Sequence, residues 1–129
     1  MDPVFLTLSD VIDIHTDQIR RYGGSPEIRD VGLLGSARGM PKAGFGGEYL
    51  HSDIFEMAAA YLYHIVSNHP FVDGNKRTGA VSAIVFLILN GYQLKCREED
   101  LEQLVLGIAK GEHPKHTAAD FLRRHGRES

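Results

Sequence analysis

The sequence is poor in cysteine and in basic residues, and each shortage argues against a class of protein. Cys96 is the only cysteine among 129 residues, so the chain can form neither an intramolecular disulfide nor a cysteine metal cluster. This fits a reducing cytoplasm, where we expect the protein. Lysine and arginine number 14 against 17 acidic residues, giving a formal charge of −3. Proteins that bind nucleic acid through its phosphates normally carry a basic excess, so direct nucleic-acid binding is not expected.

The sequence also lacks a long apolar run. The longest mainly apolar stretch, residues 80–92, is interrupted by an Asn-Gly pair and falls short of the ~20 residues that span a bilayer. The first ten residues, MDPVFLTLSD, have neither the basic start nor the apolar core of a signal peptide. We see no repeat, no low-complexity segment and no linker. We therefore expect a single domain over residues 1–129 and no membrane contact.

The apolar residues that are present recur mostly at helical spacing. Thr7 and Asp10 resemble a capping box, which would open a first helix that ends at Gly23-Gly24. Asp30 could cap a short second helix. Residues 38–50 carry four glycines and one proline, which predicts a loop that is either functional or a plain connector.

Two stronger helices follow in the middle of the chain. The first begins near Ser52 and must end by Asn68 or His69, because the residue before Pro70 is pushed out of helical geometry. The second, residues 76–89, is apolar nearly all round and is expected to be the central buried helix.

The last third of the chain predicts a short extended piece over residues 92–96 and an amphipathic helix within residues 97–111. Thr117 with Asp120 resembles another capping box, opening a final helix. The basic residues 123–127 are expected to form a solvated face or a frayed tail. The fold class is therefore all-α, a compact bundle of about six helices.

Residues 68–79, NHPFVDGNKRTG, concentrate polar chemistry at the start of the second middle helix. The first turn of a helix exposes unpaired backbone N–H groups and the positive end of the dipole, so it attracts anions. Gly74 leaves that backbone accessible, and Lys76 and Arg77 add the two side chains that most often hold phosphate. The stretch is not a G-x-x-x-x-G-K-[ST] loop, which occurs nowhere in the chain.

Two further residues complete a possible phosphoryl or nucleotidyl transfer site. Asp73 supplies a carboxylate of the kind that Mg²⁺ uses beside phosphates, and His69 supplies a base that is neutral near pH 7. Phe71 would point into the core and fix the loop. Taken singly, each residue also has an ordinary interpretation: His69 ends a helix, Asp73 or Asn75 caps the next one, and the two cations are solvated.

The stretch HPFVDGNKR resembles the Fic motif, H-P-F-x-[DE]-G-N-[GK]-R, and more narrowly its Doc (death-on-curing) branch. The likeness extends to RYGG at residues 21–24, GLL at residues 32–34 and FLILNGY at residues 86–92. It covers most of the chain. The resemblance implies a minimal Fic-like core in which the motif loop leads into a buried central helix.

The resemblance also implies roles for the motif residues. His69 would be the general base, Asp73 the Mg²⁺ ligand and Phe71 the anchor of the loop. The phosphate-binding residues would be Gly74, Asn75, Lys76 and Arg77.

Two positions depart from the pattern of AMP-transferring Fic enzymes and match Doc proteins. Lys76 stands where those enzymes have glycine, and Ala80 stands where they have a second arginine. The resemblance then implies the toxin of a type II toxin-antitoxin module, a kinase that moves the γ-phosphate of ATP to a threonine of elongation factor Tu and inhibits translation. It also implies a cognate antitoxin of the prevent-host-death type, for which an exposed apolar groove would be the docking place.

Two alternatives remain open at this stage. One is an AMP- or nucleotide-transferring Fic enzyme, and the other is a non-catalytic module that acts only through its antitoxin. A zinc site is not expected, because the seven histidines show no recognisable metal spacing. Among them, His64 is expected to be a satisfied structural residue.

Overall fold

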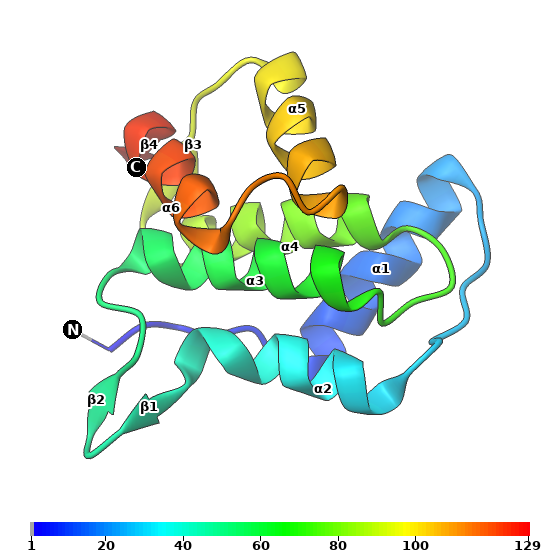
Figure 1. The fold of residues 1–129 in the computed structure, drawn as a ribbon, viewed down its shortest axis with the longest axis horizontal. Helices are drawn as coiled ribbons and strands as arrows, with labels where there is room; N and C mark the ends of the chain where they lie inside the picture. Colours follow the sequence, from blue (N-terminus) through cyan, green and yellow to red (C-terminus); the bar gives the residue numbers. More distant parts are fainter. Residues whose placement is uncertain (1) are drawn as a thin grey trace.

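The computed structural model describes residues 2–129, and its main elements there are six α-helices (Figure 1). This confirms the predicted all-α class. The helices are α1 (Leu8–Tyr22), α2 (Val31–Gly39), α3 (Ile54–Asn68), α4 (Asn75–Leu89), α5 (Glu98–Ala109) and α6 (Lys115–His125). A 3₁₀ turn (Met40–Lys42) and two short antiparallel strand pairs complete the chain, namely β1 (Gly44–Phe45) with β2 (Glu48–Tyr49) and β3 (Tyr92–Leu94) with β4 (Gly126–Glu128).

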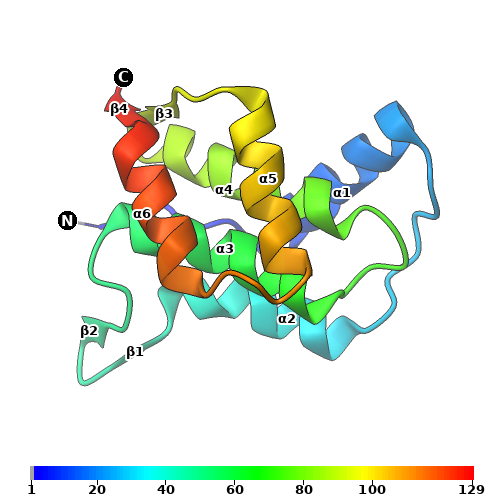
Figure 2. The same cartoon turned by 45° about the horizontal axis from the view of Figure 1, so that its top comes forward.

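Helix α3 is the most buried helix of the bundle. It runs through the middle, with α4 alongside it, α2 on one side and α5 and α6 on the other (Figures 1 and 2). Nine of its 15 residues are buried, against seven of 15 in α4. The two last apolar residues of α4, Ile88 and Leu89, are exposed. Helix α4 is thus a central buried helix as predicted, although α3 is the more buried of the two.

A glycine sets the close approach of α3 and α4. A Cβ on Gly79 would lie 2.8 Å from Val66 Cγ2 and 3.2 Å from the backbone oxygen of Leu62. Real Cβ atoms essentially never come so close, so a larger residue here would push the helices apart. Gly79 lies in the second turn of α4, directly after the loop that joins the two helices, and therefore fixes the ends of both.

The predicted capping residues hold at the first two helices. Thr7 and Asp10 form a reciprocal capping box, and the Asp30 side chain accepts a hydrogen bond from the Leu33 N–H. The predicted box at Thr117 is wrong, because α6 begins two residues earlier at Lys115 and the Thr117 N–H bonds to the Pro114 carbonyl. The backbone turn into the helix thus starts at Pro114, whose fixed φ suits a helix start.

The basic residues 123–127 form a solvated face, with Arg123, Arg124 and Arg127 exposed, and the alternative of a frayed tail is wrong. Strand β4 pairs with β3, and Arg123 on α6 forms an ion pair with Asp53 at 2.9 Å. Within residues 2–129 no helix is long and apolar enough to cross a membrane.

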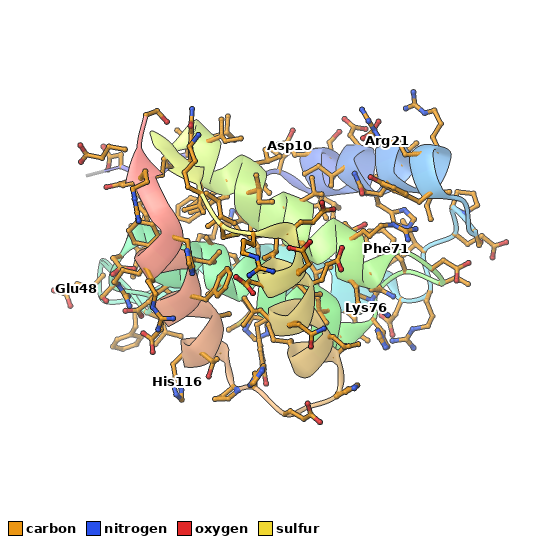
Figure 3. All side chains as sticks on the ribbon, turned by 90° about the horizontal axis from the view of Figure 1, so that it is seen from above. Asp10, Arg21, Glu48, Phe71, Lys76 and His116 are labelled. Carbon is orange, nitrogen blue, oxygen red and sulfur yellow. The ribbon has the colours of Figure 1, made fainter. Side chains whose placement is uncertain are left out.

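Of the predicted loop over residues 38–50, the first two residues end α2, and the rest forms the 3₁₀ turn and the β1–β2 hairpin. This hairpin lies at the end of the molecule opposite the α3–α4 loop (Figures 1 and 3). Figure 3 shows Glu48 of the hairpin at one end and Phe71 and Lys76 at the other. The hairpin therefore takes no part in the site described next.

Candidate active site

The loop between α3 and α4 borders a pocket of about 290 Å³. All seven residues predicted for the site line it, together with Arg29 and Val72. The predicted seven are His69, Phe71, Asp73, Gly74, Asn75, Lys76 and Arg77. The structure thus brings the predicted set together in one place.

His69 occupies an unusual backbone conformation. It ends α3 in the left-handed region, with φ 50° and ψ 54°, and it is the only non-glycine residue of the described chain with positive φ. Helix α3 cannot continue past it because Pro70 follows. His69 is exposed and lines the pocket, so its side chain is accessible from solvent.

Phe71 and Asn75 form the internal support of the loop. Phe71 is 1% exposed, which confirms that it points into the core. The Asn75 side-chain oxygen accepts a hydrogen bond from the Phe71 N–H at 3.0 Å, and its amide nitrogen donates to the Phe71 carbonyl at 2.9 Å. Both polar atoms of the Asn75 side chain are thereby used inside the loop, so its available group at the pocket is its backbone N–H.

His15 of α1 packs against the same loop, a role that the sequence did not predict. Its ring stacks on Phe71 with the centroids 3.7 Å apart, and its Nε2 lies 2.8 Å from the Asp73 carbonyl oxygen. A carbonyl only accepts, so Nε2 carries the hydrogen. Burial lowers the pKa of His15, which keeps the ring neutral in this tautomer. The helical spacing of His15 from Val11 and Gln18 could have predicted that it lies on the buried face of α1.

The Asp73 carboxylate is exposed beside the pocket. One oxygen, Oδ2, accepts a hydrogen bond from the Ser25 N–H at 2.7 Å, and Oδ1 has no partner in the described chain. This holds the carboxylate in place while leaving an oxygen free. Groups of three or more possible metal-binding side chains do not occur within residues 2–129. One carboxylate oxygen suits Mg²⁺, which takes one or two protein oxygens and completes its shell with phosphate and water.

The N-terminus of α4 has no side-chain cap. Gly74 is the N-cap residue with φ 82°, and the first helical hydrogen bond runs from the Thr78 N–H to its carbonyl. The alternative in which Asp73 or Asn75 caps this helix is therefore wrong. The positive φ favours glycine at this position, and a Cβ there would also make a tight contact with α1, 3.2 Å from Ile19 Cδ1. The uncapped first-turn N–H groups remain available to an anion.

Lys76 and Arg77 make this helix end strongly positive. Both side chains are exposed, and neither forms an ion pair within residues 2–129. The Arg77 guanidinium lies over the Tyr22 ring, 4.8 Å from its centroid. Tyr22 thus orients Arg77 without neutralising its charge.

A second hollow adjoins the pocket and shares Lys76 and Arg77 with it. This groove, of about 480 Å³, lies between α1, α4 and α5, and Ala80 is in its wall. Its apolar lining comes mainly from α4 and α5, through Val81, Ile84, Leu101, Val105 and Leu106. The groove therefore combines this apolar lining with Lys76 and Arg77 at the end nearest the pocket and with Glu98 and Glu102 on its α5 side.

The chain matches known proteins over most of its length. Residues 5–87 match the model of the Fic/DOC family. The chain is 39% identical over 115 residues to "Protein kinase doc" of Escherichia phage P1, covering 89% of this chain and 90% of that protein. It is also 39% identical over 94 residues to "Toxin Doc" of Mycolicibacterium smegmatis, covering 69% of this chain and 72% of that protein.

Proposed function

Because the chain belongs to the Fic/Doc family, we propose that it is a Doc-like toxin that acts as a protein kinase. In this proposal it transfers the γ-phosphate of ATP to a threonine of elongation factor Tu and thereby inhibits translation in the cytoplasm. The observation that carries the proposal is the meeting of an exposed base, an exposed carboxylate and an uncapped helix N-terminus in one pocket.

The phosphates of ATP would bind at the N-terminus of α4. The backbone N–H groups of residues 75–77 and the Lys76 and Arg77 side chains provide donors and positive charge there. Asp73 would hold Mg²⁺ through its exposed carboxylate, and the ion when bound neutralises charge on the phosphate oxygens. His15 and Ser25 keep the backbone and carboxylate of Asp73 in place during this binding.

His69 would act as the general base. Its imidazole takes the proton of the threonine hydroxyl as that oxygen bonds to the γ-phosphorus, and the bond from this phosphorus to the bridging oxygen of ADP breaks. ADP leaves with the electron pair of the broken bond. The exposed position of His69 lets a protein substrate reach it.

Transfer of phosphate rather than AMP is favoured by the chemistry around Ala80. This residue stands one turn beyond Lys76 and Arg77 in the wall of the apolar groove. A methyl group there offers no donor to a nucleotide tail, whereas the second arginine of AMP-transferring Fic enzymes would. AMP transfer to a protein remains the second candidate function, because the motif residues themselves serve both reactions.

The groove between α1, α4 and α5 is the proposed docking site of the cognate antitoxin. An amphipathic antitoxin segment would place its apolar face along Ile84 and Leu101 and an acidic residue near Lys76 and Arg77. Binding there would cover the two cations that the pocket shares with the groove. The antitoxin would then inhibit the toxin by occupying part of its phosphate site.

The proposal is tested by incubating the chain with ATP, Mg²⁺ and purified elongation factor Tu and then measuring the mass of the target. We expect one added phosphoryl group, mapped to a threonine. An added adenylyl group would favour the AMP-transferring alternative. Growth arrest by a His69→Asn variant equal to that by the parent chain would favour the non-catalytic alternative.

A further inference from the structure

The C-terminal end of α3 needs hydrogen-bond donors that its own continuation cannot supply. The last carbonyls of a helix are usually satisfied by N–H groups of the residues that follow. Here the residue after His69 is Pro70, which has no N–H. Pro70 ends the helix, and the Val72 N–H, which would bond the Asn68 carbonyl in a continued helix, donates to the Glu27 carbonyl instead. The carbonyls of Asn68 and His69 are therefore bonded by donors from elsewhere in the chain.

Arg29, from the segment between α1 and α2, supplies these donors. Its Nε donates to the His69 carbonyl at 2.6 Å, and its second terminal nitrogen donates to the Asn68 carbonyl at 2.9 Å. The planar guanidinium presents these two N–H groups in a fixed fork, so one side chain binds both carbonyls at once.

The backbone around Arg29 binds the rest of the loop. The Arg29 and Asp30 N–H groups donate to the Pro70 carbonyl at 2.7 and 3.0 Å. The Val72 N–H donates to the Glu27 carbonyl at 3.0 Å, and Ile28 pairs with Phe71 in an antiparallel bridge. Residues 27–30 thus run beside residues 69–72 like a short strand pair, with the Arg29 side chain at its His69 end.

These contacts surround His69, whose left-handed backbone conformation is unfavourable. Left-handed φ is disfavoured for histidine and persists only where the surroundings hold it. The Arg29 fork bonds to the carbonyl of His69 itself and to that of the residue before it. It therefore fixes the two peptide units that direct the His69 side chain toward the pocket.

We propose that Arg29 is a positioning residue for phosphoryl transfer, which holds the base His69 in its left-handed conformation through the Asn68 and His69 carbonyls. The expected effect of Arg29 on the reaction rate rests on the proposed function, whereas its effect on the His69 backbone does not. Arg29 forms no ion pair within residues 2–129, and two of its nitrogens are bound to backbone carbonyls. Its task is therefore to hold the loop rather than to pair with an acid.

The kinetic test compares Arg29→Ala and Arg29→Lys with the parent chain. We expect kcat to fall by about 10²-fold in Arg29→Ala, because a small misplacement of a reacting group has an effect of that order. KM for ATP should stay unchanged, since the phosphate-binding N–H groups of α4 do not touch Arg29. Lysine offers no fork and should restore little of the rate. Added guanidinium ion should restore kcat of Arg29→Ala, and methylammonium should not.

Arg20→Ala is the matched control, because Arg20 is an exposed arginine on α1 with no side-chain hydrogen bond in the described chain. It should leave both kcat and KM unchanged. Equal losses in the Arg20 and Arg29 variants would contradict a specific role for Arg29. A rise in KM for ATP with kcat unchanged would instead place Arg29 among the nucleotide-binding residues and overturn the proposal.

A second readout does not depend on activity. The Cα and Cβ chemical shifts of His69 and its HN–Hα coupling report its backbone conformation by NMR. We expect left-handed values in the parent chain and values moved toward extended backbone in Arg29→Ala, with the rest of the spectrum retained. Unchanged His69 values in the variant would overturn the proposal. If no substrate is phosphorylated by the parent chain, this readout still decides the role of Arg29.

Discussion

Two histidines of the same helix region, His69 and His64, show how different surroundings give the same side chain different uses. His69 ends α3 in a strained conformation and is exposed at the pocket. His64 lies five residues earlier, is half-buried, and its Nε2 is 3.0 Å from the Lys115 ammonium of α6. The same ammonium lies 3.1 Å from Nε2 of the buried His51.

The two regions also treat their cations differently. Lys115 uses two of its donors on imidazole nitrogens, which bind α6 to α3 and to the segment before it. Burial, then the nearby Lys115 and His51, lower the pKa of His64 to about 4, so it stays neutral as an acceptor. Lys76 at the pocket is exposed and has no such partner within residues 2–129. Polar groups that satisfy one another stabilise the fold, and those left open are available for a ligand.

The largest expected effect comes from replacing histidine with asparagine, once at His69 in the pocket and once at His64 beside Lys115. His69→Asn should reduce phosphoryl transfer by about 10²- to 10⁴-fold, the usual contribution of a general base. Asparagine tolerates left-handed φ, so the melting temperature should stay close to that of the parent chain. His64→Asn should do the reverse, leaving transfer intact and lowering the melting temperature. Initial rates and thermal unfolding of both variants check this, and equal activities would contradict the assignment of His69.

The second prediction concerns the carboxylate at the pocket. Asp73→Asn should keep the hydrogen bond from the Ser25 N–H, because the asparagine oxygen still accepts, but should weaken the binding of Mg²⁺. We expect the Mg²⁺ concentration for half-maximal transfer to rise by about tenfold or more, because loss of even an outer-shell partner of a metal ligand typically has an effect of that order. A Mg²⁺ titration of initial rates checks it. An unchanged titration would contradict the role of Asp73 as the metal ligand.

The third prediction concerns the Lys115 cluster. Lys115→Met should lower the free energy of unfolding by about 1–3 kcal/mol, because it leaves the buried Nε2 of His51 without a donor. Phosphoryl transfer should not change. Denaturant unfolding measures the difference, with the exposed Lys95→Met as control. A fall in phosphoryl transfer by folded Lys115→Met would contradict the purely structural role of this cluster.

A smaller effect should appear in the pH dependence of stability. Burial lowers the folded-state pKa values of His15, His51 and His64 below 6.5, and that of His64 to about 4. Between these values the unfolded chain binds more protons, so the free energy of unfolding should fall as the pH drops from about 6.5 toward 4. His64→Asn should make this slope shallower. The check is denaturant unfolding of both chains across this pH range.

Local signals in the sequence predicted the parts of the structure that depend on neighbours along the chain. The capping box at Thr7, the end of α3 before Pro70 and the grouping of the motif residues all follow from short-range rules. The box at Thr117 failed because Pro114 started the helix first. Helix α3 proved more buried than α4 because its alanines at residues 58–60 are enclosed by neighbours that are distant in the sequence.

The remainder of the site depends on contacts between distant segments. Arg29 reaches His69 across 40 positions, and His15 reaches Asp73 across 58. No periodicity or motif links such residues in a single sequence. The sequence also did not show that the Asn75 side chain supports the Phe71 backbone. The proposed contact of Asn75 with phosphate is therefore through its backbone N–H.

The central claim is that the pocket at the end of α3 transfers the γ-phosphate of ATP with His69 as base. Its most direct test uses parallel reactions with ATP labelled at the γ- or the α-phosphate, with the parent chain, His69→Asn and His64→Asn. We expect γ-label on the target protein for the parent and His64→Asn, and at least about 10²-fold less for His69→Asn. Transfer of α-label, or γ-label that does not depend on His69, would contradict it.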